Sequence, residues 1–189
     1  SHDDVCAEIC DRTGLQVIAV DYRLSPEHLH PAAFDDVCAV IRAVPGPVVL
    51  AGDSAGGNLA AAASHAMRGS AAQILGQVLI YPGLGGTPDA GSYLTHAKAP
   101  MLTRDDVLFY ARIRHAGTEP APDPSFAPLS DSDFSGLPPT LAIAASTESE
   151  GVTSIVRIDG PATGPDITFT SNPELPEEEV LSRLLFGRG

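Results

Sequence analysis

The residues best suited to chemistry stand in Gly52-Asp53-Ser54-Ala55-Gly56, a serine between two glycines. The apolar run VVLAG precedes this stretch and an Ala-rich segment follows it, so the pattern predicts a strand, a sharp turn and a helix. Such a turn lifts the Ser54 side chain out of the sheet edge, and the helix amino-terminus offers the Ala55 N–H to a developing oxyanion. We expect Gly52 and Gly56 to be small because strand and helix come too close there for a β-carbon.

Two other interpretations of this stretch are a glycine-rich structural turn and a nucleotide-binding loop. Phosphate-binding patterns of the GxxxxGK[ST] and GxGxxG types do not occur in the sequence. The residues therefore favour a nucleophile elbow.

The elements that must hold this turn alternate between strand-sized apolar runs and helical segments. Strands are predicted where apolar and β-branched residues run together, at residues 15–24, 48–52, 77–84 and 140–145. Helices are predicted after the elbow and at residues 1–14, 32–44 and 102–117. This alternation predicts an α/β fold, a mostly parallel sheet flanked by helices.

Capping residues define two of these helices. Ser1 is the expected cap of the first helix, with Asp4 answering it and Gly14 closing the last turn. Thr103 caps and Gly117 stops the helix that begins near residue 102.

The last forty residues follow a different pattern. Residues 152–161 and 166–173 alternate polar and apolar side chains and are bounded by Gly-Pro and Asn-Pro turn signals, which predicts half-exposed antiparallel strands. Residues 176–189 then predict a short amphipathic helix, with three glutamates in its first turn. The change of pattern lies between residues 139 and 152.

Composition limits the class of protein. The chain has 189 residues, 43% of them hydrophobic, which is enough for one domain with a real core. Its net charge of −13 argues against nucleic acid and anionic membrane surfaces as partners. No signal peptide and no apolar run of about 20 residues is found, so a cytoplasmic location without a membrane partner is expected.

Three cysteines, Cys6, Cys10 and Cys38, give an odd count without a CxxC pair. Cys6 and Cys10 share a helical face, a spacing that a metal site also uses. Buried thiols in a reduced compartment are the preferred interpretation, so neither a metal nor a cofactor is predicted.

Two motifs together resemble the hormone-sensitive-lipase-like branch of α/β-hydrolase esterases: DYRLSPEHLHPAAFDD (21–36) followed by GDSAGGNLA (52–60). Shorter stretches extend the resemblance over residues 1–145: YPGLGG (81–86), PMLT (100–103), DPSFAPL (123–129) and DFSGLPPT (133–140). The resemblance implies that Ser54 is the acyl-accepting nucleophile and that the Ala55 N–H is one oxyanion donor. It also implies a loop beside the site, to which we assign a packing and salt-bridge role, formed by Asp21, Tyr22, Arg23 and Glu27.

Several catalytic and structural features of the family are missing from this sequence or are not found at the expected positions. A His-Gly-Gly-Gly segment upstream of a stretch like residues 1–10 completes the oxyanion hole, and removing one donor costs about 10²–10³ in rate. The family's triad order is Ser, then Asp, then His. Glu148 lies near the place of the acid, but the D-P-L-like sequence expected there is absent, and no histidine follows His115. We expect the three histidines after the elbow to be surface or loop residues: His65, His96 and His115. The family's amino-terminal cap helices and first three strands are missing as well. In the family sheet the third of these strands lies between the strands predicted here at 15–24 and 48–52, so its loss is expected to leave the sheet open in its middle.

The carboxy-terminal residues 150–189 resemble a second family, the TamB-type translocation and assembly proteins of the bacterial envelope. The stretch SNPELPEEEVLSRLLFGR (171–188) carries this resemblance, which extends upstream as far as Leu141 at most. It implies a β-rich architecture with envelope partners.

These observations predict a partial α/β-hydrolase domain at residues 1–145 and a TamB-like β-hairpin-plus-helix tail at 146–189. The expected function is serine carboxylic-ester hydrolysis acting on a small-molecule ester of short acyl length, with little or no activity in this chain. The alternatives are a non-enzymatic envelope or binding module, with a periplasmic location, and a chimeric chain that does not fold stably.

Overall fold

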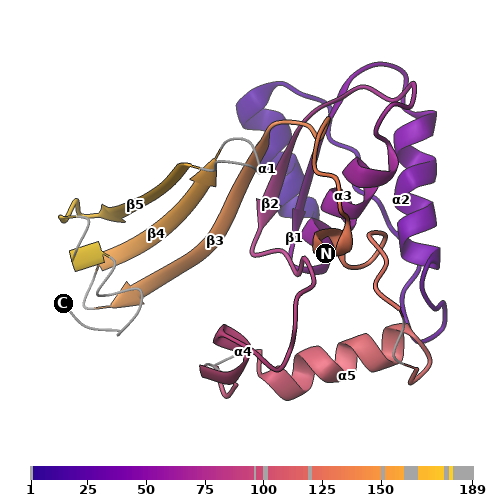
Figure 1. Ribbon diagram of the computed structural model, residues 1–189. Helices are drawn as coiled ribbons and strands as arrows, with labels where there is room; N and C mark the ends of the chain where they lie inside the picture. Colours follow the sequence, from indigo (N-terminus) through magenta and orange to yellow (C-terminus); the bar gives the residue numbers. More distant parts are fainter. Residues whose placement is uncertain are drawn as a thin grey trace.

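Five strands form one sheet in the order β1-β2-β3-β4-β5 (Figure 1). The computed structural model describes residues 2–95, 97–99, 102–118, 121–149, 152–159, 166–176 and 179–180. The strands are β1 Val48–Asp53, β2 Ile74–Ile80, β3 Thr140–Ser149, β4 Val152–Asp159 and β5 Asp166–Asn172. β1, β2 and β3 are parallel, while β3, β4 and β5 are antiparallel, so the predicted partial α/β-hydrolase sheet with a hairpin tail is confirmed.

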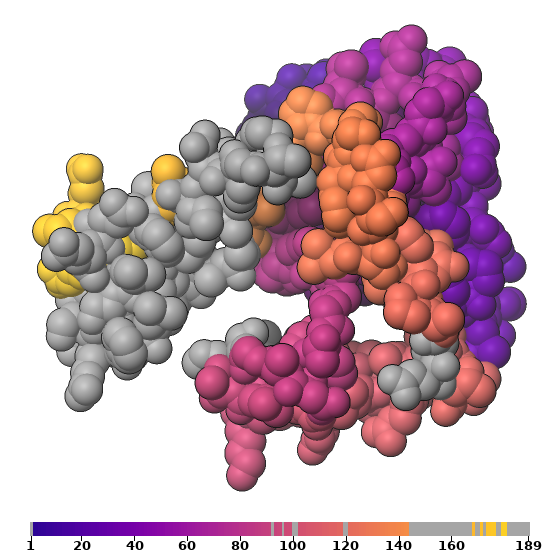
Figure 2. Space-filling view, viewed as in Figure 1, coloured from indigo at the N-terminus to yellow at the C-terminus, as the bar shows by residue number. Residues whose placement is uncertain are grey.

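The helices lie beside the parallel half of the sheet. They are α1 Asp3–Thr13, α2 Ala32–Ala43, α3 Ala55–Ala66, α4 Ser92–Thr95, α5 Arg104–Arg114 and the short 3₁₀ helix η1 Pro128–Ser130. Thr103 caps α5 as predicted, because its hydroxyl accepts the Asp106 N–H while the Asp106 carboxylate accepts the Thr103 N–H. In the space-filling view, the α4–α5 region stands away from the sheet as a ledge (Figure 2).

Helix α3 is the centre of the core. Residues 57–65 are all buried, between α2 on one side and strands β1 and β2 on the other. Alanines allow the helix to lie close to the sheet, so Ala63 packs against Cys38 and Ile41 of α2, and Ala60 packs against Leu79 of β2. The helix therefore fixes its own first residue, at the end of β1, with little freedom to move.

Strand β3 belongs to both halves of the sheet. Its residues 140–143 pair in parallel with 77–80 of β2, and residues 141–149 pair antiparallel with β4. The strand predicted at 140–145 therefore continues to Ser149, because β4 supplies a ladder along its whole length. β3 also runs without interruption past residues 145 and 146, where the boundary between the two domains is predicted. This domain boundary stays a prediction.

The strand predicted at residues 15–24 is absent from the structure, although these residues are all described. Leu15 is 61% and Ile18 48% exposed. A strand needs a neighbour to bind its backbone N–H and C=O groups, and β2 is the one described strand that pairs with β1. An apolar run without a ladder therefore forms no strand.

Three smaller expectations also need correction. The strand predicted at 77–84 lies at Ile74–Ile80, because Pro82 has no N–H for a ladder. His2 is the residue that precedes α1, and Ser1 lies outside the described residues. Cys10 is exposed, whereas Cys38 is buried as expected.

The predicted carboxy-terminal helix lies mostly outside the described residues. Val180, on its predicted apolar face, is fully buried. None of the described helices has the length and apolar character that a bilayer crossing requires.

Candidate active site

Ser54 lies between the end of β1 and the first residue of α3, with its side chain exposed. Its backbone angles are φ 49° and ψ −113°, a conformation that residues with a β-carbon rarely adopt. Two backbone hydrogen bonds hold it there: its N–H donates to Ile80 O at 2.8 Å, and its carbonyl accepts the Asn58 N–H at 3.0 Å. The sheet and the helix therefore impose the strain on Ser54 from both sides.

Glycines make the turn sterically feasible, but they differ from the predicted pair. A β-carbon on Gly52 would lie 2.3 Å from the Gly56 carbonyl carbon, so position 52 requires glycine as predicted. A β-carbon on Gly56 would meet one atom within 4 Å, Asp53 Oδ1 at 3.9 Å, so the prediction for Gly56 is wrong. Gly57 is the tighter position, because its β-carbon would lie 3.0 Å from both Gly52 O and Pro82 Cβ.

Ala55 begins α3 and is exposed. The first intrahelical bond is that from Asn58 N–H to Ser54 O, so the N–H groups of residues 55–57 precede the helical ladder. No acidic side chain stands in this first turn. The positive end of the helix dipole therefore faces the region beside Ser54, as an oxyanion donor must.

Asn58 ties this helix to three other segments. Its amide nitrogen donates to Gly83 O at 2.5 Å and Phe126 O at 2.9 Å, and its amide oxygen accepts from Arg114 Nη1 at 3.1 Å. The side chain is buried, and all three bonds reach residues distant in the sequence. Asn58 was not predicted, although a single amide in an Ala-rich helix was a usable signal for it.

A cluster of nitrogen-bearing side chains lies next to Asn58. Arg114 Nη2 is 3.5 Å from His30 Nδ1, and His30 Nε2 is 3.0 Å from Ser125 Oγ. The His115 ring lies 5.2 Å from His30 and 4.6 Å from Phe126, centroid to centroid. Because a guanidinium donates and never accepts, His30 Nδ1 is the acceptor, and Nε2–H donates to the serine.

Burial sets the protonation of this cluster. It lowers the pKa of His30, with Arg114 and His115 adding to the effect, and it lowers the pKa of His115, with Arg114 adding. Burial also raises the pKa of Tyr22, which the Asp53 carboxylate raises further and Arg114 lowers. Tyr22 thus lies within electrostatic range of both the elbow and Arg114.

The histidines and the acid considered for a triad do not gather at Ser54. His65 is buried and its Nδ1 is 2.8 Å from Asp131 Oδ2, so the expectation of a surface or loop residue is wrong for His65. His115 caps the end of α5, and His96 lies outside the described residues. Glu148 stands within β3, opposite Thr153 of β4, with its side chain outside the described part of the structure.

The loop of residues 21–27 holds a salt bridge, as predicted for Arg23. The guanidinium of Arg23 binds the Asp36 carboxylate at 2.8 Å, and its backbone N–H donates to the same group. These hydrogen bonds lower the pKa of Asp36 to about 2. The loop is therefore fastened to α2.

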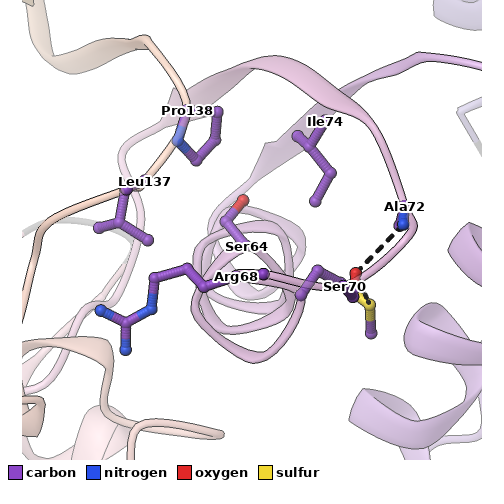
Figure 3. Close-up of a pocket in the computed structure, with 10 residues that line it drawn as sticks. Ser64, Arg68, Ser70, Ala72, Ile74, Leu137 and Pro138 are labelled. Carbon is purple, nitrogen blue, oxygen red and sulfur yellow. Dashed lines mark hydrogen bonds between the residues drawn. The ribbon is translucent and has the colours of Figure 1, made fainter.

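A cavity of about 290 Å³ lies at the far end of α3 from Ser54 (Figure 3). Ser64, Ser70 and Ile74 line it on one side, and Leu137 and Pro138 on the other. The Ser64 hydroxyl donates to Gln77 Oε1, and the Ser70 hydroxyl accepts the Ala72 N–H. This cavity therefore offers little unsatisfied polarity, and it is remote from the elbow.

No group of three or more histidine, cysteine or acidic side chains with metal-binding geometry occurs among the described residues. Cys6 and Cys10 lie on α1, one partly buried and the other exposed.

Comparison with protein families gives two matches. A family model described as alpha/beta hydrolase fold matches residues 1–150, and one described as TamB C-terminal domain matches residues 128–189. Both resemblances drawn from the sequence are thereby confirmed, but the second match begins at residue 128, upstream of the expected limit at Leu141. The two matches overlap at residues 128–150, a range that contains the whole of β3.

Curated relatives include a carboxylic ester hydrolase, LipN of Mycobacterium tuberculosis, 33% identical over 86% of this chain and 49% of its own length. An esterase of Acinetobacter venetianus is 35% identical over 78% of this chain and 51% of its own length. The gibberellin receptor GID1B of Arabidopsis thaliana is 27% identical over 84% of this chain. The chain spans about half the length of these relatives.

Among solved structures, the metagenomic thermophilic carboxylesterase EstE1 is similar to the chain. It has a TM-score of 0.67 and 34% identity, over 74% of this chain and 52% of its own.

Proposed function

The chain belongs to the α/β-hydrolase family whose model matches residues 1–150, and from this we propose that it carries the nucleophile elbow of a serine carboxylic-ester hydrolase. In this proposal Ser54 accepts the acyl group of a small ester, and the Ala55 N–H binds the oxyanion. The carboxylesterases among the relatives, at 33% to 35% identity, support this reaction class.

One observation carries the proposal: an exposed serine held at φ 49° directly before an open helix amino-terminus. This backbone conformation costs free energy, about 1–3 kcal/mol, and such strain collects at functional sites. A merely structural turn here would favour glycine at position 54.

We further propose that these 189 residues alone turn esters over slowly. No histidine follows His115 in the sequence, and His65 and His115 are both engaged away from Ser54. A serine without a base keeps an ordinary hydroxyl, which is a poor nucleophile. We expect a rate below about 10⁻⁴ of that of a complete triad.

The test combines covalent labelling with turnover. The chain is incubated with p-nitrophenyl acetate and, separately, with a fluorophosphonate, and the modified serine is located by peptide mass spectrometry. We expect Ser54 to be modified at least about tenfold faster than Ser70, because the helix amino-terminus stabilises the adduct at Ser54 alone. Steady-state release of p-nitrophenol is measured in the same samples.

The Ser54→Ala variant is the control. Labelling spread evenly over the serines contradicts the assignment of Ser54. Release of p-nitrophenol above the buffer background that persists unchanged in this variant contradicts it as well. Rapid steady-state turnover that disappears in Ser54→Ala supports Ser54 as the nucleophile. The same result contradicts the proposal that these residues alone turn esters over slowly.

A second candidate function is a binding role without catalysis. Two observations favour it: one relative of this chain is a receptor, and the TamB C-terminal model matches residues 128–189. Under the hydrolase proposal the chain works in the cytoplasm; under this one the tail directs it to the envelope. Fractionation of cells that express the chain separates the two, since recovery with envelope proteins favours the binding role.

A further inference from the structure

Arg114 stands out among the arginines as a partly buried cation without a carboxylate. Arg68, Arg104 and Arg114 are the partly buried arginines of the described residues. Arg68 binds Asp131 and Arg104 binds Asp89. Arg114 has no acidic group within 4 Å in the described part of the chain. Its side chain hydrogen-bonds to the neutral Asn58 and His30, and its Cζ lies 5.9 Å from the centroid of the Phe126 ring.

An unpaired cation in this position is costly. Burial lowers the pKa of Arg114, which records the penalty on its charged form. Its partners Asn58 Oδ1 and His30 Nδ1 use two of its five N–H groups, so the guanidinium keeps donors for a ligand. The residue as a whole is partly exposed to solvent.

We propose that Arg114, with His30 and His115 beside it, binds a small carboxylate next to the Ser54 elbow. One permanent charge and a planar pair of donors match a monoanionic carboxylate, which a guanidinium binds through two parallel hydrogen bonds. The site lies close to Ser54 because Asn58 joins the two: its N–H binds Ser54 O and its side chain binds Arg114.

The source of the carboxylate rests on the proposed function, whereas the site itself does not. Ester hydrolysis releases a free carboxylic acid, and a half-ester of a dicarboxylic acid brings a carboxylate with the substrate. Acetate represents the first source and monomethyl succinate the second.

Binding becomes tighter as the pH falls and the His115 ring becomes protonated. His30 faces Arg114 of α5 and His115, which follows that helix, with Asp123 and Asp35 contributing opposite charge. Asp123 is itself bound by the Ser125 N–H at 2.7 Å. A bound anion favours the protonated His115 ring, so it raises the pKa of His115, and a proton is taken up with the ligand. His30 stays neutral in the complex, because its Nδ1 accepts from Arg114.

The experiment is an NMR titration of the full chain with acetate, monomethyl succinate and inorganic phosphate. We expect saturable shifts of the His30 and His115 ring protons with a Kd of about 1–10 mM, and no shift of the exposed His28. If monomethyl succinate binds more tightly than acetate, the carboxylate bound at Arg114 belongs to the substrate. If the two bind equally, it is the acid released by hydrolysis. Tighter binding of phosphate than of both carboxylates overturns the proposal.

Arg114→Gln should weaken acetate binding about tenfold or more, through loss of a charge-assisted pair. Arg112→Gln, on the same helix and exposed, is the matched control and should bind within about twofold of the parent chain. Equal weakening in both variants, or unchanged binding in Arg114→Gln, overturns the proposal. If Arg114→Gln does not fold by circular dichroism, absence of saturable His30 and His115 shifts in the parent chain overturns it. The NMR titration measures binding and does not require ester turnover. Failure to label Ser54 would therefore contradict the proposed function without affecting the test of the carboxylate site.

Discussion

The two ends of helix α3 differ in whether their polar groups are exposed or buried in internal hydrogen bonds. At the start, Ser54 is exposed and strained, and the N–H groups of residues 55–57 precede the helical ladder. At the other end, His65 is buried against Asp131, and Ser64 donates to Gln77. Internal hydrogen bonds at the second end hold the helix in place, which allows the first end to keep donors and a hydroxyl for a ligand.

Gly52→Ala should have the largest effect on this contrast. Its β-carbon would meet backbone atoms of the other side of the turn, so we expect a loss of about 3 kcal/mol or failure to fold. Chemical denaturation measures the change. Gly56→Ala is the matched control and should be neutral or slightly stabilising, because its β-carbon has room. Similar losses of stability in the two variants would show that position 52 is no more sterically restricted than position 56.

His65→Ala tests the buried end. The substitution removes one of the two partners of Asp131, leaving Arg68, and it removes the ring that packs edge-on against Phe134, so we expect a loss of about 2 kcal/mol. Thermal and urea unfolding measure it. His28→Ala changes an exposed histidine and should stay within about 0.5 kcal/mol of the parent chain. A negligible effect of His65→Ala would remove the contrast between the two ends.

Ser54→Gly sharpens the contrast in the opposite direction. Glycine accepts φ 49° without strain, so we expect a gain of about 1 kcal/mol together with complete loss of labelling at position 54. Ser132→Gly, at an exposed position without a positive φ, should give no gain. Destabilisation by Ser54→Gly would mean that the serine contributes to the fold itself.

The smallest effect is expected for the pH dependence of stability, which depends on Asp131 at the buried end of α3. The hydrogen bond from His65 is the main cause that lowers the pKa of Asp131 from 3.8 to about 2. A lowered carboxyl pKa stabilises the fold fully above pH 3.8, and this contribution is lost as the pH falls through about 2. The stability of Asp131→Asn should therefore depend less on pH in this window, which unfolding at a series of pH values measures. Identical pH profiles would contradict the assignment.

The local features of the fold could be predicted from the sequence, because they depend on neighbouring residues. The strand–turn–helix around Ser54 and the Thr103 cap are of this kind. Pairing between distant segments could not be predicted. The ladder that extends β3 to Ser149 depends on β4, and the lack of any ladder at residues 15–24 depends on the absence of a described partner.

The candidate site shows the same limit. Ser54 and Ala55 follow from a motif within five residues, and their roles stay a proposal. The cluster of Arg114, His30 and Asn58 is assembled from segments 56 and 84 positions apart, so no local pattern contains it. Gly57 was missed because its constraint depends on how closely the turn folds: its β-carbon would meet both Gly52 O and Pro82 Cβ, the second of which comes from a distant segment.

The double pairing of β3 has a consequence for the order of folding. The β3–β4–β5 meander joins neighbours in the sequence, and such hairpins close in about 1–10 μs. The pairing of β2 with β3 spans more than sixty residues, as Gln77 opposite Thr140 shows, and loop closure makes it slower. We therefore expect the meander to form early and to offer the other edge of β3 as a ready template on which the parallel strands assemble.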